Sequence, residues 1–230
     1  MNLKDKVIVI TGGSKGLGKA LAISFIKEGA KVVISSHDKN ELEKTATEIN
    51  ATAIFADVTK ENEVRNLAEN VGTDFGKIDI WVNNAGVMYS FPKGELIDMG
   101  KAHNIFDVNF FGVIFGCRTA QRSMFSSGGT IMTINSSSGL DATRASNYKL
   151  YAASKWAVRG FLQAFTAENK ESNIKNISVY PGGIKTELYP TDKPSNFDDF
   201  MEPSYVANII IENLKNENPE EELIIKRPGK

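Results

Sequence analysis

The chain has 230 residues, a formal net charge of −1 and ordinary hydrophobic (41%) and charged (24%) fractions, which together predict one globular α/β domain. The near-neutral net charge gives no indication of binding to nucleic acid or to an anionic membrane. No stretch of the sequence approaches the roughly 20 apolar residues of a membrane span. One cysteine and two histidines exclude an intrachain disulfide, predict a reducing, cytoplasmic setting, and leave no cluster suited to a metal ion.

Strand and helix patterns alternate along the chain. Residues 1–6 lack the pattern of a signal peptide and lead into a β-branched apolar run, which predicts a strand buried on both faces. In chain order the patterns predict strand 6–11, helix 15–27, strand 31–35, helix 39–49, strand 52–56, helix 60–71, strand 78–82, helix 104–125, strand 130–134, helix 150–169, strand 175–180, helix 203–214 and strand 222–226. This alternation predicts a single Rossmann-like, doubly wound domain over residues 1–230, with about seven parallel strands flanked by helices.

Local signals mark two helix ends and three loops. Gly29 follows the first predicted helix, as a C-terminal glycine does. Asp38, with Glu41 three residues later, resembles a capping box at the start of the second helix. Residues 87–100, 141–149 and 186–201 are expected to be irregular loops, and we expect them to contact a substrate.

Glycine and polar residues follow four of the predicted strands, at 11–18, 83–86, 136–139 and 181–186. Such residues do not build a hydrophobic core. Because ligands bind at the carboxyl ends of the strands in a doubly wound sheet, we expect these four segments to line one crevice.

The first of these segments has the pattern Thr11-Gly-x-x-x-Gly-x-Gly18 between a strand and a helix. Glycines there allow a tight turn and let a pyrophosphate approach backbone N–H groups at a helix N-terminus. The spacing differs from Gly-x-Gly-x-x-Gly, and the Gly-Lys-Ser/Thr ending of a P-loop is missing, which disfavours ATP or GTP hydrolysis. A plain tight turn is the alternative interpretation.

Tyr151 and Lys155 lie four residues apart in a predicted helix and therefore share one face. A nearby cation favours the phenolate, so Lys155 is expected to lower the pKa of Tyr151 and make it a usable acid or base. The alternative is an ordinary helix with a half-buried tyrosine. Tyr148 has Ala152 four residues on, so it lacks such a partner.

The motifs occur in an order that resembles the short-chain dehydrogenase/reductase family, from about residue 4 to residue 186. They are the glycine turn, Asn83-Asn84-Ala85-Gly86, Asn109, Ser136, Tyr151-x-x-x-Lys155 and Pro181-Gly182. Each is weak singly, but their joint order is specific. The resemblance implies a seven-stranded parallel sheet and a nicotinamide cofactor lying across the strand ends.

The resemblance also implies which residues hold that cofactor. The pyrophosphate would meet the glycine turn, the adenine would meet Asp57, and the nicotinamide would lie near Pro181 and Thr186. For Asp57, a helix-capping role before Thr59 is the alternative. The implied contacts are Gly12, Ser14, Lys15, Gly16, Leu17, Gly18, Ser36, His37, Asp57, Val58, Asn83, Ala85, Gly86, Tyr151, Lys155, Pro181, Gly182, Ile184 and Thr186.

The implied catalytic residues are Asn109, Ser136, Tyr151 and Lys155. Ser136 is favoured over Ser138 because the family pattern ends its strand with Ser-x-x-Gly, although the family's usual spacing to the tyrosine would select Ser138. Asn109 would order Lys155 and relay protons through backbone and water, or it would simply form a helix–helix hydrogen bond.

NADP is predicted over NAD. Asp38 lies twenty residues after Gly18, where a carboxylate usually holds the NAD ribose, but it already serves as a helix cap. The discriminating family position is Ser36, followed by His37 where NADP enzymes often have Arg. Lys15 and Lys39 would add positive charge for a phosphate.

The sequence thus predicts an NADP(H)-dependent oxidoreductase that reduces a small-molecule ketone or aldehyde, or performs the reverse reaction, with the tyrosine as general acid or base. A catalytically silent cofactor-binding sensor or scaffold and a 3-oxoacyl-thioester reductase are the alternatives. The roughly 45 residues after Thr186 are too few for the substrate domain of nucleotide-sugar epimerases. A homodimer or homotetramer through helices 104–125 and 150–169 is expected.

Overall fold

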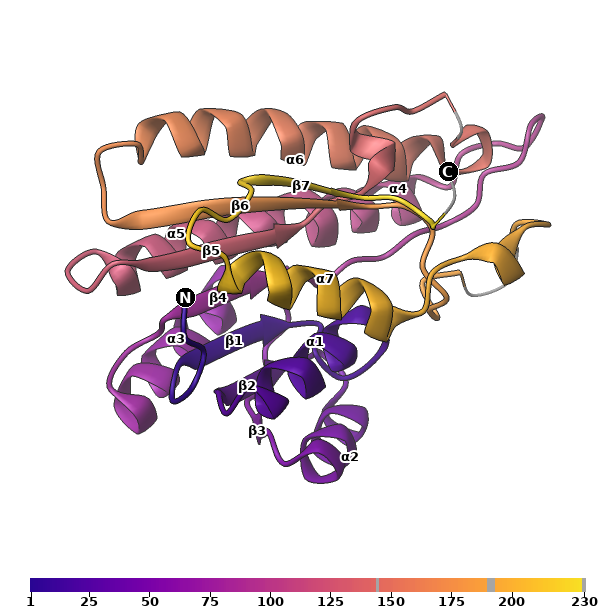
Figure 1. The fold of residues 1–230 in the computed structure, drawn as a ribbon. Coiled ribbons are helices and arrows are strands. Elements are labelled where there is room, and N and C mark those ends of the chain that lie inside the picture. Colours follow the sequence, from indigo (N-terminus) through magenta and orange to yellow (C-terminus); the bar gives the residue numbers. More distant parts are fainter. Residues whose placement is uncertain (144, 190–192, 229–230) are drawn as a thin grey trace.

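In the described part of the computed structural model, residues 1–143, 145–189 and 193–228, seven parallel strands form one sheet (Figure 1). Residue 144 of the predicted loop 141–149, residues 190–192 of the predicted loop 186–201, and residues 229–230 lie outside the described residues. The strand order is β3-β2-β1-β4-β5-β6-β7. The strands are β1 (Val7–Thr11), β2 (Lys31–Ser35), β3 (Thr52–Ala53), β4 (Ile80–Asn83), β5 (Gly129–Ile134), β6 (Ile174–Pro181) and β7 (Glu222–Ile225).

Helices cover both faces of the sheet, as the alternating pattern predicts. One hydrophobic cluster joins the sheet to α1, α2 and α7, and a second joins it to α3, α5 and α6. Figure 1 shows α7 beside α1 on one face and α6 across the other. The helices are α1 (Gly16–Lys27), α2 (Lys39–Ile49), α3 (Glu61–Phe75), α4 (Met99–Phe106), α5 (Gly112–Met124), α6 (Lys149–Glu168) and α7 (Pro203–Lys215).

The helix expected at 104–125 differs from the structure. It begins at Met99, inside the predicted loop 87–100, because the Asp98 side chain accepts a hydrogen bond from the Lys101 N–H and caps the first turn. It then changes to a π-helix, η1 (Asp107–Phe111), before α5 continues it. Such π-helical turns are rare and occur often at functional sites.

The third strand is shorter than the predicted 52–56. Only Thr52 and Ala53 form ladder pairs with β2. The Ile54 and Ala56 amides still donate to Ile34 and Ser36, but the chain then turns toward the carboxyl ends of the strands.

Both predicted helix-end signals are confirmed. The Asp38 carboxylate accepts a hydrogen bond from the Glu41 N–H at 3.1 Å and caps α2. Gly29 has φ +80°, the left-handed conformation that ends many helices after their last turn.

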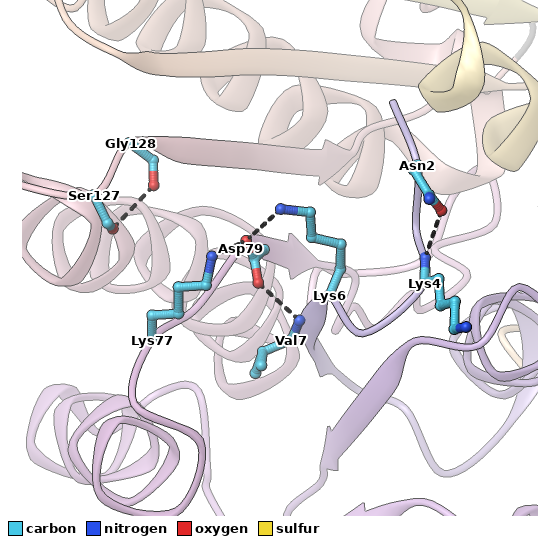
Figure 2. A network of polar contacts seen from close by, with 8 residues as sticks. All are labelled: Asn2, Lys4, Lys6, Val7, Lys77, Asp79, Ser127 and Gly128. Carbon is cyan, nitrogen blue, oxygen red and sulfur yellow. Dashed lines mark hydrogen bonds and ion pairs between the residues drawn. The ribbon is translucent and has the colours of Figure 1, made fainter.

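A charged network joins the start of β1 to the start of β4 (Figure 2). Asp79 receives hydrogen bonds from the Lys6 and Lys77 ammonium groups at 3.0 and 2.8 Å, and from the Val7 N–H at 3.0 Å. Partial burial alone would raise the pKa of Asp79, but these hydrogen bonds outweigh it and hold the pKa below the usual value. The carboxylate therefore fixes the register of two central strands at the edge opposite the predicted crevice.

We expect Asp79→Ala to lower the free energy of unfolding by about 1–3 kcal/mol at neutral pH, because the Val7 N–H and two ammonium groups lose their acceptor. A depressed carboxyl pKa stabilises the fold above the unfolded-state pKa of about 3.9, and this contribution disappears as the pH falls through the folded-state pKa. Urea unfolding across this range measures it. Asp74→Ala, at an exposed position in α3, is the control; an equal loss there would contradict the assignment.

Candidate active site

A cavity of about 1300 Å³ opens where the strands of the sheet end. The segments after β1, β2, β4, β5 and β6 all contribute to its wall, so the polar strand ends do meet in one crevice. Figure 1 shows segment 87–100 and the described parts of segments 141–149 and 186–201 at this same end of the molecule. Predicted site residues that line it are Gly12, Ser14, Lys15, Gly16, Leu17, Gly18, Ser36, His37, Asp57, Val58, Ala85, Gly86, Ser136, Tyr151, Lys155, Pro181, Gly182, Ile184 and Thr186.

The glycine turn between β1 and α1 has no room for side chains at three positions, Gly12, Gly13 and Gly18; a Cβ on Gly13 would lie 2.7 Å from the Ile34 Cβ. Gly12 has φ +62°, and a Cβ there would lie 2.8 Å from the Ala85 Cα. A Cβ on Gly18 would collide with the Gly12 carbonyl oxygen. These contacts require glycine, and the turn they pack lines the cavity at the N-terminus of α1.

Two residues not among the predicted contacts hold this turn in place. The Asn84 amide donates to the carbonyl oxygens of Thr11 and Gly12, both at 2.9 Å. The Thr45 hydroxyl, from α2, donates to the Ser14 carbonyl at 2.8 Å. Asn84 belongs to the quoted Asn-Asn-Ala-Gly segment, so its position was visible in the sequence. Thr45 had no local signal.

The edge of the cavity beside β2 contains Ser36, His37 and Asp57. The Ser36 hydroxyl accepts a hydrogen bond from the Asp38 N–H at 3.3 Å. The Asp57 carboxylate accepts from the Thr59 N–H and hydroxyl, both at 2.9 Å, so it stabilises the turn that precedes α3. Lys60 rather than Asp57 occupies the N-cap position of that helix. Lys39 is not part of the cavity wall; its ammonium lies 4.8 Å from the centroid of the Phe55 ring.

Asn83 differs from its predicted role as a cofactor contact. Its side chain is buried and points away from the cavity, where Oδ1 accepts from the Trp81 indole at 2.7 Å. Its Nδ2 donates to Cys117 Sγ and Thr133 Oγ1, both at 3.3 Å. Strand residues alternate between faces, so Asn83, at the end of β4, joins the sheet to α5, and Asn84 faces the opening instead.

Ser136 and Tyr151 are in contact at the end of β5. Burial raises the pKa of Tyr151 above its ordinary value, and a hydrogen bond with the Ser136 side chain partly offsets that rise. The Ser138 N–H donates to the Ser136 oxygen at 3.1 Å, which orients the hydroxyl. Of the two serines weighed from the sequence, Ser136 is therefore the one that contacts the phenol.

Lys155 lies one turn after Tyr151 in α6 and is almost fully buried. Burial lowers its pKa from 10.5 to about 8, because a buried ammonium loses its hydration. Its Nζ donates to the Ile134 carbonyl at 3.0 Å and lies 5.6 Å from the centroid of the Tyr151 ring. The predicted lowering of the Tyr151 pKa by Lys155 is not found here, since burial dominates and raises that pKa.

Asn109 lies in the π-helix η1 and is completely buried. Its Oδ1 accepts from the Val87 N–H at 2.8 Å, and its Nδ2 donates to the Val87 carbonyl at 2.9 Å and the Ser154 hydroxyl at 3.2 Å. It thereby joins the segment after β4 to Ser154, the residue before Lys155 in α6, and it does not line the cavity. The helix–helix hydrogen bond weighed from the sequence is present.

Asn135, which was not predicted, also positions Lys155. Its Nδ2 donates to the Lys155 carbonyl at 3.2 Å, and its side chain fills the space that a Cβ on Gly139 would need. Its place directly before Ser136, at the end of a strand, was the only signal in the sequence.

Aromatic side chains form the wall of the cavity beyond Tyr151. The Tyr189 ring lies 5.8 Å from Tyr148 and 5.6 Å from Phe200, in edge-to-face or inclined geometry. Burial, together with nearby Tyr151 and Tyr148, raises the pKa of Tyr189 strongly. Tyr148, which lacks a helical lysine partner, therefore still belongs to the cavity wall.

Comparisons with known proteins agree with this geometry. A family model described as short chain dehydrogenase matches residues 6–195. An uncharacterized oxidoreductase of Listeria monocytogenes is 36% identical over 199 residues, which are 83% of this chain and 79% of that protein. An uncharacterized oxidoreductase of Staphylococcus aureus is 32% identical over 213 residues, which are 91% of this chain and 90% of that protein. The chain belongs to the short-chain dehydrogenase family.

Solved structures of the short-chain dehydrogenase family share the fold. An alcohol dehydrogenase of Thermococcus sibiricus, complexed with 5-hydroxy-NADP, has a TM-score of 0.87 and 25% identity, and the match covers 99% of this chain and 98% of that one. A short-chain type dehydrogenase/reductase of Mycobacterium marinum has a TM-score of 0.88 and 27% identity, covering 98% of this chain and 95% of that one. The protein is accordingly an NAD(P)-dependent oxidoreductase acting on small molecules.

The residues present fit the nicotinamide cofactor of this short-chain dehydrogenase. Gly12, Gly16 and Gly18 line the cavity at the N-terminus of α1, the position where a dinucleotide's phosphates bind the backbone. One continuous cavity runs from Ser36 past this turn to Pro181. None of the helices in the described ranges is long and apolar enough to cross a membrane, and within those ranges no three His, Cys, Asp or Glu side chains are grouped to hold a metal ion.

Proposed function

We propose that the protein transfers a hydride between NADP(H) and a small ketone or aldehyde, with Tyr151 as the acid that completes reduction to the alcohol, or as the base in the reverse direction. The observation that carries this proposal is the contact between Tyr151 and Ser136 in a cavity that also contains the glycine turn and buried Lys155. A fold that only binds a nucleotide has no chemical need for Ser136, Tyr151 and Lys155 in one cavity.

When bound, the nicotinamide supplies or accepts the hydride. Ser136 donates a hydrogen bond to the carbonyl oxygen and holds it beside the Tyr151 hydroxyl. As negative charge develops on that oxygen, Tyr151 gives it a proton. The raised pKa of Tyr151 keeps the phenol protonated at neutral pH, which is the state an acid needs.

Lys155 stabilises the phenolate that remains after proton transfer. Its pKa of about 8 leaves the ammonium protonated at neutral pH, and the low-dielectric surroundings strengthen its attraction to a new negative charge. Asn109 and Asn135 act on this step indirectly, because they fix the helix segment that contains Ser154 and Lys155.

The direct test is oxidation of NADPH against a panel of aldehydes and ketones that includes a 3-oxoacyl thioester. Turnover that is specific for one carbonyl class supports the proposal. Tight NADPH binding with no turnover of any member would favour the catalytically silent sensor or scaffold and would overturn the proposed reaction.

The preference for NADP rests on the charge around the edge of the cavity beside β2. Asp38, the carboxylate at the distance where NAD enzymes bind the ribose, is engaged in capping α2. Lys15, Ser36 and His37 line the cavity, and the Lys15 side chain is exposed at the glycine turn. The Thermococcus sibiricus relative is complexed with an NADP derivative.

We expect the wild type to bind NADP more tightly than NAD, and Lys15→Gln to weaken NADP about tenfold while changing NAD by less than about threefold, because only NADP carries the extra phosphate. Titration calorimetry with both cofactors measures this. Lys175→Gln, at an exposed position on β6, is the matched charge control. Tighter wild-type binding of NAD would contradict the assignment.

Three further expectations stay predictions. The segments 87–100, 141–149 and 186–201 would determine the substrate, and cavity-lining Met88, Leu140 and Tyr189 support that role. Association into a homodimer or homotetramer would use residues 104–125 and 150–169; Phe111 in η1 and Trp156 in α6 are 45% and 46% exposed. The cytoplasmic location also stays a prediction.

A further inference from the structure

Arg227 lies just after β7 and lines the cavity beside the aromatic wall. Its guanidinium carbon is 4.9 Å from the centroid of the Phe200 ring, which is a stacking distance. Its Nη1 is shielded from water and has no hydrogen-bond acceptor among residues 1–143, 145–189 and 193–228. A guanidinium N–H group that is shielded from water without an acceptor is unfavourable unless another group pairs with it.

The position of Arg227 is fixed by the sheet. The Gly182 N–H donates to the Ile225 carbonyl at 2.9 Å, so the segment after β7 runs beside the Pro181-Gly182 strand end. The guanidinium stacks on Phe200, whose ring centroid lies 5.6 Å from that of Tyr189. Tyr151 lines the same cavity as these residues. The proposed proton donor and the guanidinium therefore both belong to the wall of one cavity.

Acidic side chains nearby are engaged elsewhere. The Asp141 carboxylate accepts hydrogen bonds from Thr143. Glu202, at the start of α7, forms an ion pair with Lys185 at 2.8 Å. Glu187 lies toward the glycine turn, where its Oε2 would be 3.7 Å from a Cβ on Gly16. In the described part of the chain no carboxylate forms an ion pair with Arg227.

We propose that Arg227 binds a carboxylate of the substrate, so that the enzyme acts on oxo-acids whose carbonyl and carboxylate are joined by an apolar body. The inference rests on the proposed function for the position of the carbonyl, at Ser136 and Tyr151. The aromatic wall of Tyr148, Tyr189 and Phe200 packs against the apolar body, and the planar guanidinium matches a carboxylate through paired hydrogen bonds.

A cofactor phosphate is the competing occupant. The glycine turn that suits phosphates lies at the opposite side of the cavity from the segment after β7, because β1 and β7 are separated in the sheet by β4, β5 and β6. Arg227 accompanies the strand end assigned to the nicotinamide instead. Removal of Arg227 should therefore leave the dissociation constant of NADP unchanged within about twofold.

The test compares oxo-acids with their uncharged methyl esters. 3-Benzoylpropionate and levulinate, in which two methylene groups join the carbonyl to the carboxylate, are titrated calorimetrically, each with its ester, into the NADP-loaded protein. For Arg227→Met, which keeps an apolar stem, we expect acid binding to weaken about 10- to 100-fold and ester binding to change less than about threefold. Arg227→Lys should retain part of the acid preference, and Lys175→Met controls for net charge. Thermal melts confirm that each variant folds.

Each outcome supports or contradicts either the role of Arg227 or the proposed reaction. Lys226, the neighbouring cation, also lines the cavity, so Lys226→Met is measured as well. Equal wild-type binding of acids and esters, loss of acid binding in Lys226→Met but not in Arg227→Met, or weaker NADP binding by Arg227→Met would overturn the role of Arg227. Ester turnover with NADPH would still uphold the proposed function. Selective acid binding through Arg227 without turnover of any acid or ester would uphold the role of Arg227 and contradict the proposed reaction.

Discussion

Tyr151→Phe is expected to lower kcat by about 10²–10⁴-fold, because the substitution removes only the hydroxyl that supplies the proton. The ring, its packing and the nearby Lys155 ammonium stay in place. Hydride transfer to a carbonyl would then leave an alkoxide with no acid in contact with it. Steady-state oxidation of NADPH, measured with the best substrate of the carbonyl panel, gives the number.

Two measurements separate this chemical effect from damage to the fold. The dissociation constant of NADP should change by less than about threefold in Tyr151→Phe. Tyr148→Phe removes another phenol from the same cavity wall, and its kcat should fall far less, since Tyr151 is the phenol that forms a hydrogen bond with Ser136. Near-normal turnover by Tyr151→Phe, or an equal loss in Tyr148→Phe, would refute Tyr151 as the donor.

The parts of this protein that the sequence predicts well are those governed by local pattern. The five residues of β1 are all buried, as a continuous apolar run between two layers of helices requires. Tyr151 and Lys155 share a face because α6 is regular there. Glycine is demanded at Gly12 and Gly18 by contacts with neighbouring backbone, and the turn's spacing already indicated it.

The parts that the sequence does not predict depend on contacts distant in the chain. The π-helical turn at Asn109 arises where one amide pairs with Val87, 22 residues away, and with Ser154, 45 residues away. Asn83 and Asn84 are adjacent, yet only their alternation across the end of β4 decides which faces the cavity. Arg227 reaches the active site because β7 pairs with β6, and no local pattern marks it.

The direction of the Tyr151 pKa is the most instructive difference. From the sequence, a lysine one helical turn away predicts a lowered pKa. In the folded protein the phenol is buried, and loss of hydration of its charged form outweighs the influence of its neighbours. The same burial acts on Lys155 in the opposite sense and lowers its pKa to about 8. The pair is thus held in a state where both groups are protonated at neutral pH, ready for transfer from the tyrosine.

Burial of the protonated Lys155 side chain destabilises the folded protein, and Lys155→Met should reveal this destabilisation. Folding lowers the pKa of Lys155 from about 10.5 to about 8. As the pH rises, Lys155 therefore loses its proton at a lower pH in the folded protein than in the unfolded chain. Below about pH 8 both states carry the charge, and the folded state bears the full desolvation penalty. Between about pH 8 and 10.5 the unfolded state binds more protons, so the stability of the wild type rises with pH across that window.

We therefore expect Lys155→Met to unfold at a temperature a few degrees higher than the wild type at pH 7, corresponding to about 1–3 kcal/mol. An apolar side chain of similar length replaces a buried cation that donates to the Ile134 carbonyl. The rise in wild-type stability above pH 8 should be absent from the variant.

Turnover by Lys155→Met should fall at least about 100-fold, because the phenolate of Tyr151 loses its stabilising charge. Thermal melts across pH 7–10.5 and steady-state kinetics measure both effects. Lys175→Met, which removes an exposed cation, should change neither, and a destabilised Lys155→Met protein would show that the ammonium supports the fold as well as the reaction.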